Sequence, residues 1–379
     1  MERIALLGCT GSIGMHVLNV VRRHGDKYKI EAAVCNSNIP ALLKIAGEFK
    51  PAYCGVSDEN LSVKFNNALC AALDFSKDAQ RTAATLSDVD TVIIASSGLS
   101  GLCAVIEAIK QKKKVLIATK EILVAAGKII VDLVKQNDVK LIPIDSEHSA
   151  IFQCLAGSKR EQLKRIILTA SGGPFFKLPF SEFKNIKLQD TLNHPKWKMG
   201  KKITVDSATM MNKGQEVIEA KWLFDLNLDQ IDCIIHPESL IHSMVEFSDS
   251  SVICQMSNPN MEIPIQYALS YPNRFVTNIE SINFEKIRKL EFFKIDKKKF
   301  PCYNLAIRAF SENLGLVLNA ANEVAVNAYL ESKIGFLDIA AVVEYSLNKF
   351  HSIKADSISD IFYYDGKVKD FANRLIKKA

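Results

Sequence analysis

Short apolar runs alternate with amphipathic stretches over the first 145 residues of the chain. The runs have the length of buried strands, and the stretches between them carry apolar residues at helical spacing. Strands that alternate with helices in this way predict a doubly wound parallel sheet in an α/β domain. The six strand-like runs are Ile4–Leu7, Ile30–Val34, Ala52–Val56, Thr91–Ala95, Val115–Ala118 and Leu141–Ile144.

The pattern changes after residue 145. Strand-like pieces with few regular helices predict a central α+β domain, followed by a charged, irregular linker and a C-terminal helical domain. We therefore expect four segments, at residues 1–145, 146–272, 273–300 and 301–379. The strand-like pieces of the second segment are Arg165–Thr169, Ile203–Val205, Cys233–His236, Ser243–Phe247 and Val252–Gln255. The clearest helices of the last segment are Leu314–Ser332 and Leu337–Lys349.

The first strand leads directly into a glycine-rich loop that opens a predicted helix. The loop has the spacing G-x-x-G-x-x-G from Gly8 to Gly14, and Thr10 and Ser12 add hydroxyl groups. In a Rossmann-like domain, backbone N–H groups of such a loop face the pyrophosphate of a dinucleotide. The alternative is an ordinary glycine-rich turn.

The residues after the second predicted strand bear on the choice of dinucleotide. Asn36, Ser37 and Asn38 include no acid that could hold the ribose hydroxyl of NAD, which favours NADP. They include no basic residue either. A 2'-phosphate would therefore rely on neutral donors or on a basic residue from elsewhere.

The segment Val205–Glu216 gathers hydroxyl, amide, ammonium and carboxylate groups. We expect a strand to end where it starts and a helix to follow with Ser207 as its N-cap, an arrangement that attracts phosphate. Asn212, Lys213 and Glu216 fall on one helical face, where Lys213 can contact the phosphate. Glu216 suits that place only if a cation lies between it and the anion. The alternative is a capped surface helix with an internal Lys–Glu pair.

Two carboxylates follow the sixth strand-like run, in Asp145-Ser146-Glu147-His148. Strand alternation would place Asp145 and Glu147 on the same side, at the carboxyl edge where open α/β sheets bind ligands. With Glu216 they form an all-oxygen set that suits Mg²⁺ or Mn²⁺. A helix cap at Asp145 or Ser146 is the alternative, and we interpret His148 as a packing residue.

Two further segments offer complementary chemistry. Ser171-Gly172-Gly173-Pro174 ends a strand-like run, where it forms either a tight turn or a phosphate contact through N–H groups and a hydroxyl. The loop from His194 to Gly200 holds Trp197 and Met199 between a proline and a glycine. This composition predicts a lid that closes over a ligand, or else a surface loop anchored by its tryptophan.

Composition narrows the class of protein. The 379 residues are 48% hydrophobic and 24% charged, and the net charge of +6 is spread over scattered lysines, which argues against nucleic-acid binding and leaves anionic small molecules as partners. Nine widely spaced cysteines without a C-x-x-C indicate reduced thiols, with neither zinc nor disulfides. We see no targeting segment and no apolar run of bilayer length, so we expect a cytoplasmic protein without a membrane partner.

Taken together, these segments resemble the family of 1-deoxy-D-xylulose 5-phosphate reductoisomerases over nearly the whole chain. The resemblance implies rearrangement and reduction of that sugar phosphate with NADPH and Mg²⁺ or Mn²⁺, giving 2-C-methyl-D-erythritol 4-phosphate in the methylerythritol phosphate pathway of isoprenoid biosynthesis. It also implies a homodimer. The matching residues are Gly8–Gly14, Lys120-Glu121, Asp145–His148, Ser171–Phe175, His194-Pro195, Trp197, Met199-Gly200, Val205–Glu216, His236-Pro237, Ile241–Val245 and Ala320–Glu323.

The resemblance also implies roles for individual residues. It implies that Asp145, Glu147 and Glu216 bind the cation, and that these three and Lys120 are the catalytic residues. Lys120 and Glu147 are the candidates for proton transfer. The implied substrate contacts are Lys120, Ser146, Glu147, Ser171, His194, Ser207, Asn212, Lys213 and Glu216. The implied cofactor contacts are Thr10, Gly11, Ser12, Ile13, Asn36, Ser37, Asn38, Thr119, Glu121 and Gly200, and the lid residues are Trp197 and Met199.

Two other functions stay open on the residues alone. An NADP-dependent dehydrogenase of a small keto or aldehyde phosphate would not need three carboxylates for a metal, so its activity would survive EDTA. A dinucleotide-sensing binding protein would need neither paired carboxylates nor a lid. The presence of both features argues against the sensor.

The chain departs from the family pattern near the cofactor. Thr119 replaces the usual asparagine before Lys-Glu, and Asn36 and Ser37 replace the usual glycine and basic residue near the adenosine ribose. Because no positive charge there pairs with a 2'-phosphate, we expect a smaller preference for NADPH over NADH than a basic residue gives. Steady-state kinetics with both cofactors measures the ratio, and a very large value would contradict this expectation.

Overall fold

The computed structural model describes residues 1–63, 72–197 and 199–377, so Cys70 and Lys198 lie outside the described part. Contacts divide the chain into two compact units. The first unit comprises residues 1–122, 130–149 and 260–278, and the second comprises residues 123–129, 150–259 and 279–379. This division differs from the four consecutive segments expected, because a stretch from the middle of the chain packs with the N-terminal sheet.

The first unit is built on a parallel seven-stranded sheet with the order β4-β3-β2-β1-β5-β6-β7. The strands are β1 (Glu2–Leu7), β2 (Tyr28–Cys35), β3 (Tyr53–Val56), β4 (Asp74–Phe75), β5 (Thr91–Ile94), β6 (Lys114–Ile117) and β7 (Leu141–Pro143). All six expected strands are present, and β4 is an additional short one. The apolar runs are buried along most of their length, as expected for parallel strands covered on both faces. The predicted doubly wound α/β sheet is confirmed.

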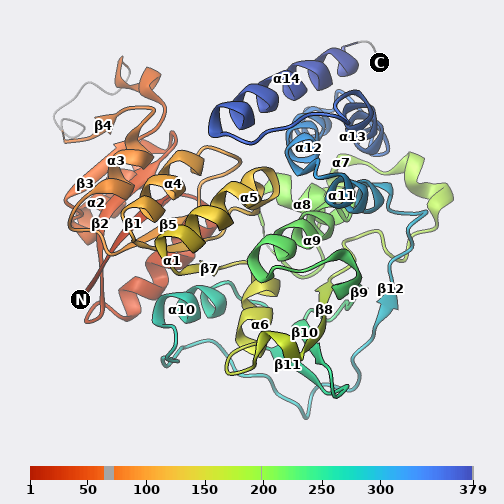
Figure 1. Cartoon of the computed structure of the whole chain (residues 1–379), viewed down its shortest axis with the longest axis horizontal. Coiled ribbons are helices and arrows are strands. Elements are labelled where there is room, and N and C mark those ends of the chain that lie inside the picture. The colour runs from red at the N-terminus through yellow and green to blue at the C-terminus, as the bar shows by residue number, and fades with distance from the viewer. Residues whose placement is uncertain (64–71, 198, 378–379) are drawn as a thin grey trace. The chain divides into compact units, whose positions relative to one another are not determined.

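Helices connect these strands, and one helix joins them from far along the chain. They are α1 (Ser12–Arg23), α2 (Ile39–Phe49), α3 (Ala79–Thr85), α4 (Leu102–Lys110), α5 (Lys120–Asn137) and α10 (Glu262–Ser270), with a 3-10 turn at Glu59–Val63. Helix α10 lies beside α1 (Figure 1). There Glu262 accepts hydrogen bonds from Arg23 at 2.6 Å and Asn19 at 3.0 Å. These contacts explain why residues 260–278 belong to the first unit.

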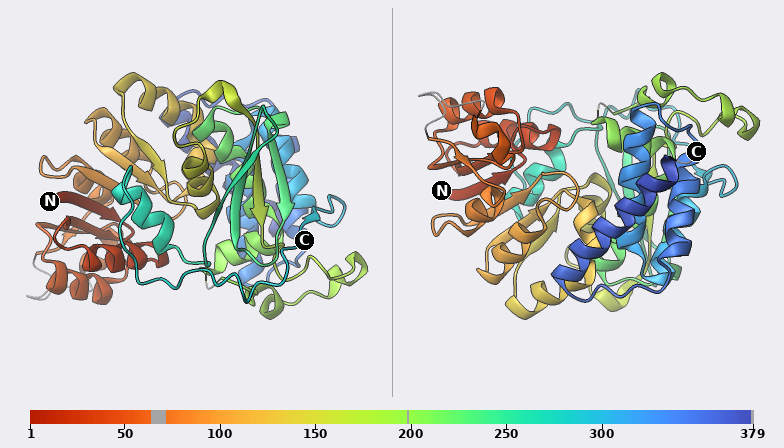
Figure 2. Two further views of the ribbon diagram at one scale, coloured as in Figure 1. Left: turned by 90° about the horizontal axis from the view of Figure 1, so that it is seen from below. Right: turned by 90° about the horizontal axis from the view of Figure 1, so that it is seen from above.

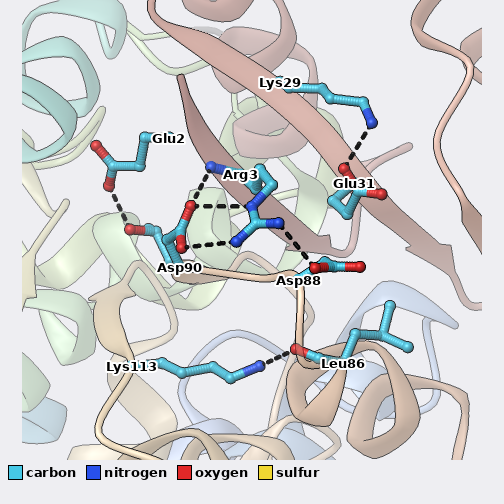
Figure 3. Close-up of polar contacts among 9 residues, drawn as sticks. Glu2, Arg3, Lys29, Glu31, Leu86, Asp88, Asp90 and Lys113 are labelled. Atoms are coloured by element: carbon cyan, nitrogen blue, oxygen red, sulfur yellow. Dashed lines mark hydrogen bonds and ion pairs between the residues drawn. The ribbon is translucent and has the colours of Figure 1, made fainter.

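Charge pairs hold the amino-terminal edge of the first sheet (Figure 3). The Arg3 guanidinium lies 2.8 Å from Asp88 and 3.3 Å from Asp90, while Lys29 on β2 pairs with Glu31 at 2.7 Å. The Arg3 pairs are exposed, so solvent screens them and each contributes little to stability. They lie at the edge opposite the glycine loop, which follows the carboxyl end of β1.

The second unit contains a mixed five-stranded sheet with the order β11-β10-β8-β9-β12. Its strands are β8 (Leu163–Ala170), β9 (Ile231–Ile235), β10 (Ile241–Phe247), β11 (Val252–Met256) and β12 (Phe293–Lys294). Strands β8 and β9 are parallel, and the other pairs are antiparallel. This arrangement agrees with the expected α+β character.

Helices complete the second unit, and together with the sheet they enclose its apolar core. They are α6 (Ser146–Cys154, which begins in the first unit), α7 (Leu188–Leu192), α8 (Lys201–Ala208), α9 (Met211–Phe224), α11 (Pro301–Glu312), α12 (Gly315–Leu330), α13 (Asp338–Lys349) and α14 (Ile358–Ile376). Short 3-10 turns lie at Arg160–Gln162, Phe180–Asn185 and Leu228–Gln230. Helix α9 contacts β8 and β9, and α11 contacts α9 in turn, so the C-terminal helices form a further layer on one side of the sheet (Figure 2). From Pro301 to Lys377 all regular elements are helical, as expected.

One predicted strand is wrong. Ile203–Val205 lies within helix α8, so Ser207 is in the last turn of that helix and does not cap the next one. Helix α9 begins at Met211, after Met210 in the left-handed conformation with φ of 61°. Isoleucine, threonine and valine in sequence favour a strand locally, but α8 buries Thr204 and Ala208, four residues apart, on one helical face. Packing therefore outweighs local propensity here.

Two expectations from composition concern the thiols and the membrane. The eight described cysteines are all free of disulfides. Each described helix falls short of the length or the apolar character that a membrane crossing requires.

Candidate functional site

The glycine loop of the first unit has the geometry of a phosphate cradle. Gly8 has φ of +88°, and a Cβ atom there would lie 2.4 Å from the carbonyl oxygen of Ala95. A Cβ on Gly14 would lie 2.4 Å from the Gly8 carbonyl oxygen, so both positions require glycine. Gly11 is the N-cap residue of the twelve-residue helix α1, whose first N–H groups have no partners within the helix. The strand, loop and helix predicted from the sequence are thus present.

Predicted cofactor residues that follow β2 and β6 lie at the same edge of the first sheet, whereas Gly200 lies in the second unit. Asn36, Ser37 and Asn38 follow β2 and are exposed, and the Asn38 side chain also caps α2 by accepting a hydrogen bond from the Ala41 N–H at 3.3 Å. Thr119 follows β6 and donates its hydroxyl to the carbonyl oxygen of Ser96 after β5. The threonine hydroxyl is therefore engaged with the backbone between two neighbouring strands.

Lys120 and Asp145 form a buried ion pair where β6 and β7 end side by side. The Lys120 Nζ atom lies 2.6 Å from Asp145 Oδ2, and the two side chains are 6% and 11% exposed. Burial by itself raises the pKa of the Asp145 carboxyl, but Lys120 and His148 outweigh it and hold that pKa well below its usual range. Asp145 is therefore a carboxylate at neutral pH.

Glu147 lies beside Asp145 for a different reason from the predicted strand alternation, which is wrong. Helix α6 begins at Ser146, so Glu147 is in its first turn. Asp145 caps this turn, since its Oδ1 accepts from the Glu147 N–H at 3.2 Å and its carbonyl oxygen accepts from the Ser149 N–H at 2.8 Å. Carboxylate oxygens of Asp145 and Glu147 still lie within 4.8 Å of each other. Asp145 thus caps the helix through Oδ1 and pairs with Lys120 through Oδ2.

In the second unit, three residues predicted to bind phosphate lie together, with two serine hydroxyls around the imidazole of His194. His194 Nε2 lies 3.0 Å from Ser171 Oγ and 3.1 Å from Ser207 Oγ. Ser171 follows β8, and Ser207 is in the last turn of α8. Gly173, with φ of +63°, allows the close approach, because a Cβ there would lie 2.8 Å from the Ser207 carbonyl oxygen. The glycine pair after Ser171 is thus required for packing.

The other nitrogen of His194 holds the start of the predicted lid. Its Nδ1 accepts hydrogen bonds from the N–H groups of Lys196 at 3.2 Å and Trp197 at 2.9 Å. The proton of the neutral ring is therefore on Nε2, which faces the two serines. The Trp197 ring is half-buried, with its centroid 6.3 Å from that of His242. Gly200 caps α8, and its carbonyl oxygen accepts from Thr204.

Helix α9 places Asn212, Lys213 and Glu216 on one face, as the spacing predicts. Lys213 and Glu216 form an ion pair, and the Asn212 amide donates to Glu216 Oε1 at 2.6 Å. The side chains of the ion pair are 4% and 1% exposed, so α9 is not the capped surface helix with a Lys–Glu pair that was the alternative. An ammonium and a carboxylate buried together suit a site for ligands of both signs.

The structure brings the predicted residues together in two groups. The carboxyl edge of the first sheet holds the glycine loop, Lys120 and the Asp145–Glu147 pair, while the second unit holds the hydroxyl, imidazole, amide and ammonium groups. Asp206 and Asn322, for which the sequence indicates no role, form a buried hydrogen bond of 2.7 Å. Their positions within matching motifs were the only signal.

Models of one protein family match most of the chain. Residues 4–127 match the model described as 1-deoxy-D-xylulose 5-phosphate reductoisomerase. Residues 141–224 and 256–371 match two models of the C-terminal domain of the same enzyme.

Relatives and solved structures agree with these models. The 1-deoxy-D-xylulose 5-phosphate reductoisomerase of Thermoanaerobacter pseudethanolicus is 43% identical to the chain, and the match covers 98% of both chains. That of Bacillus pumilus is also 43% identical, and the match covers 99% of this chain and 100% of the relative. The Zymomonas mobilis enzyme in complex with NADPH is 37% identical, with a TM-score of 0.92 over 100% of both chains. A reductoisomerase in complex with NADPH, fosmidomycin and magnesium is 36% identical, with a TM-score of 0.94 over 100% of this chain and 98% of the other.

The protonation of His194 gives a test of the second-unit site. Burial lowers the pKa of His194 from 6.5 to about 4. The unfolded chain takes up this proton first as the pH falls, so stability is lost between about pH 6.5 and 4 and is unaffected above that range. We expect His194→Gln to abolish this loss, which amounts to about 2–3 kcal/mol. Urea unfolding at pH 7 and pH 4.5 measures it.

The matched control is His351→Gln, since His351 is exposed. That variant should lose the same stability as the unmodified protein on acidification. Equal losses in all three proteins would show that His194 is not held neutral.

Proposed function

The chain belongs to the family of 1-deoxy-D-xylulose 5-phosphate reductoisomerases, and we propose that the residues gathered in its two units carry out that reaction. It is an NADP-dependent oxidoreductase of isoprenoid biosynthesis that converts 1-deoxy-D-xylulose 5-phosphate to 2-C-methyl-D-erythritol 4-phosphate with NADPH and a divalent metal ion. The observation that carries the assignment of roles is the meeting of Ser171, His194 and Ser207 at hydrogen-bond distance. When bound, the cation polarises the substrate carbonyl, and NADPH supplies the electrons for the reduction.

The donor set suits a hard divalent cation. Asp145 is ionised, and its carboxylate lies within 4.8 Å of that of Glu147, a separation that small rotations can close around an ion with bonds of about 2.1 Å. We propose these two residues as ligands, together with Glu216 of the second unit. Carboxylate oxygens without thiolate or imidazole favour Mg²⁺ or Mn²⁺ over softer metals.

The second unit supplies the groups that bind the substrate phosphate. Ser171, Ser207, Asn212 and the Nε2–H of His194 are neutral donors, and Lys213 supplies the positive charge. Neutral donors around one ammonium bind a phosphate dianion through directed hydrogen bonds and leave little excess charge in the ligand-free protein. The neutral state of His194 matters, because a protonated ring would be a second buried cation near Lys213.

Lys120, Ser146 and Glu147 are proposed to bind the polyol part of the substrate. Lys120 is fixed by its ion pair with Asp145, so its ammonium can donate to a hydroxyl or carbonyl oxygen of the substrate. Glu147 accepts hydrogen bonds and is the second candidate for proton transfer. Trp197 and Met199, on the loop held by His194, are proposed to cover the ligand and exclude water from the reacting carbonyl.

Most of the residues proposed for NADPH lie along the carboxyl edge of the first sheet, and Gly200 lies in the second unit. Thr10, Gly11, Ser12 and Ile13 form the glycine loop and the start of α1, where the pyrophosphate binds. Asn36, Ser37 and Asn38 are proposed beside the adenosine ribose. Thr119, Glu121 and Gly200 are proposed nearer the nicotinamide.

We also propose a homodimer and a cytoplasmic location. Strand β11 is at the edge of its sheet, and Val252 and Ile253 on it are 50% and 48% exposed. An exposed apolar edge strand is an aggregation hazard unless it is covered, and a second copy of the chain could cover it. The free state of the eight described cysteines is the reason for proposing the reducing cytoplasm.

The direct test follows NADPH oxidation with 1-deoxy-D-xylulose 5-phosphate in the presence and absence of Mg²⁺ or Mn²⁺. We expect turnover that EDTA abolishes, and none with unrearranged aldehyde or ketone phosphates. Glu216→Gln should lower cation-dependent turnover by at least about a hundredfold, because it removes a charged ligand of the metal. NADPH affinity should not change, since the glycine loop is in the other unit.

The controls separate the roles of the two units. A fully active Glu216→Gln variant would refute its assignment as a ligand. Activity that survives EDTA, or equal turnover of unrearranged phosphates, would instead favour a simple NADP-dependent dehydrogenase.

A further inference from the structure

Asn322 belongs to the matching segment Ala320–Glu323, and its role is not explained by contact with any ligand. It lies on helix α12 and is fully buried. Its side-chain amide donates a hydrogen bond of 2.7 Å to Asp206 Oδ1 on helix α8. The two residues are 116 positions apart in the chain, so this bond joins two helices that the sequence does not connect directly.

Asp206 is a buried carboxylate whose two oxygens have different partners. Oδ1 accepts from Asn322, and Oδ2 lies 3.0 Å from the ammonium of Lys202, one turn earlier on α8. The Asp206 side chain is only 2% exposed. Because a buried carboxylate without partners is costly, rotation or sliding of α8 against α12 is opposed.

Asp206 is also connected to both parts of the proposed phosphate site. Ser207 follows it directly, with Oγ 3.1 Å from His194 Nε2. The Asp206 carbonyl oxygen accepts from the Thr209 hydroxyl at 3.2 Å, and Thr209 Oγ1 accepts from the Met211 N–H at 3.3 Å. Met211 is the first residue of α9, which carries Asn212 and Lys213. A shift of Asp206 would therefore move Ser207 and the start of α9 together.

The two ends of the Asn322 side-chain amide differ in their hydrogen bonding. Within the described part of the chain, its Oδ1 atom is buried and has no hydrogen-bond partner. A buried carbonyl oxygen without a partner is unfavourable, so the amide is not explained by packing alone. Its N–H group, which contacts Asp206, accounts for a polar residue at this position.

We propose that Asn322 is a positioning residue for substrate binding, and that its hydrogen bond to Asp206 holds Ser207 and the first turn of α9 in the geometry that binds phosphate. The proposal rests on the proposed function of that site. The side chain of Asn322 contacts Asp206. It acts through Asp206 and α8, so its loss should weaken phosphate binding and leave the NADPH site unchanged.

The test first removes the hydrogen bond between Asn322 and Asp206 and then restores it with the amide and the carboxylate exchanged between the two helices. Asn322→Asp places two carboxylates together, and we expect the affinity for inorganic phosphate to fall by about tenfold or more and KM for the sugar phosphate to rise similarly. Phosphate binding is measured by ³¹P line broadening, which requires no turnover, and NADPH binding by fluorescence. In the double variant Asn322→Asp/Asp206→Asn, an amide on α8 can donate to a carboxylate on α12, and phosphate affinity should recover.

The matched control is Lys202→Met, which removes the ion pair of Asp206 but keeps its bond to Asn322. We expect the double variant to come within about threefold of this control, because both lack that ion pair. Failure of the folded double variant to recover, or equal losses of phosphate and NADPH affinity in Asn322→Asp, would overturn the proposal. If Asn322→Asp does not fold, Asn322→Ala removes the donor without adding a charge, and unchanged phosphate affinity in that variant would also overturn it.

Failure of the proposed function gives a different result. The unmodified protein would then bind inorganic phosphate without NADPH oxidation, or would bind none. In the first case the ³¹P comparison still decides the role of Asn322. In the second case the positioning proposal falls together with the phosphate site.

Discussion

The ion pair between Lys213 and Glu216 is the interaction on which the proposed chemistry of the second unit depends. Both side chains are almost fully buried, one turn apart on α9, so neither can lose its partner without a replacement. Removing one member of a buried pair leaves an uncompensated charge, which is costly. Phosphate should therefore bind Lys213 more tightly when another positive charge binds Glu216. A divalent cation supplies that charge, and the two ligands should support each other's binding.

The first unit repeats this arrangement. Lys120 is paired with Asp145, and Asp145 is also a proposed metal ligand. A cation at Asp145 would leave the Lys120 ammonium available for the polyol of the substrate. In both units, a buried lysine forms an ion pair with a carboxylate that we propose as a metal ligand. The same residues thus form buried polar contacts of the fold and belong to the proposed ligand sites.

The success of sequence reasoning differed between the two units. The strands of the first sheet are apolar along their length because helices cover both faces, so their runs were easy to recognise. The glycine spacing and the face shared by Asn212, Lys213 and Glu216 follow from local geometry. The sequence was misleading at Ile203–Val205, where long-range packing places a β-branched run in a helix. Glu147 lies beside Asp145 as expected, but through a helix turn rather than strand alternation.

Other features depend on contacts that no local pattern reports. The bond between Asn322 and Asp206 joins helices more than a hundred residues apart, so neither residue alone indicates its role. Likewise, residues 260–278 belong to the first unit because Glu262 meets Arg23 and Asn19 on α1. Packing partners of this kind are fixed by the tertiary fold, and a single sequence carries little trace of them.

The exchange of partners by Lys213 and Glu216 is tested most directly by calorimetry of phosphate binding with and without the cation. The exchange predicts that inorganic phosphate binds about tenfold more tightly in the presence of saturating Mg²⁺ or Mn²⁺, and that phosphate tightens cation binding by the same factor. In Glu216→Gln, which removes the carboxylate of this ion pair, this dependence should disappear. Phosphate affinity that is independent of the cation in the unmodified protein would contradict the exchange.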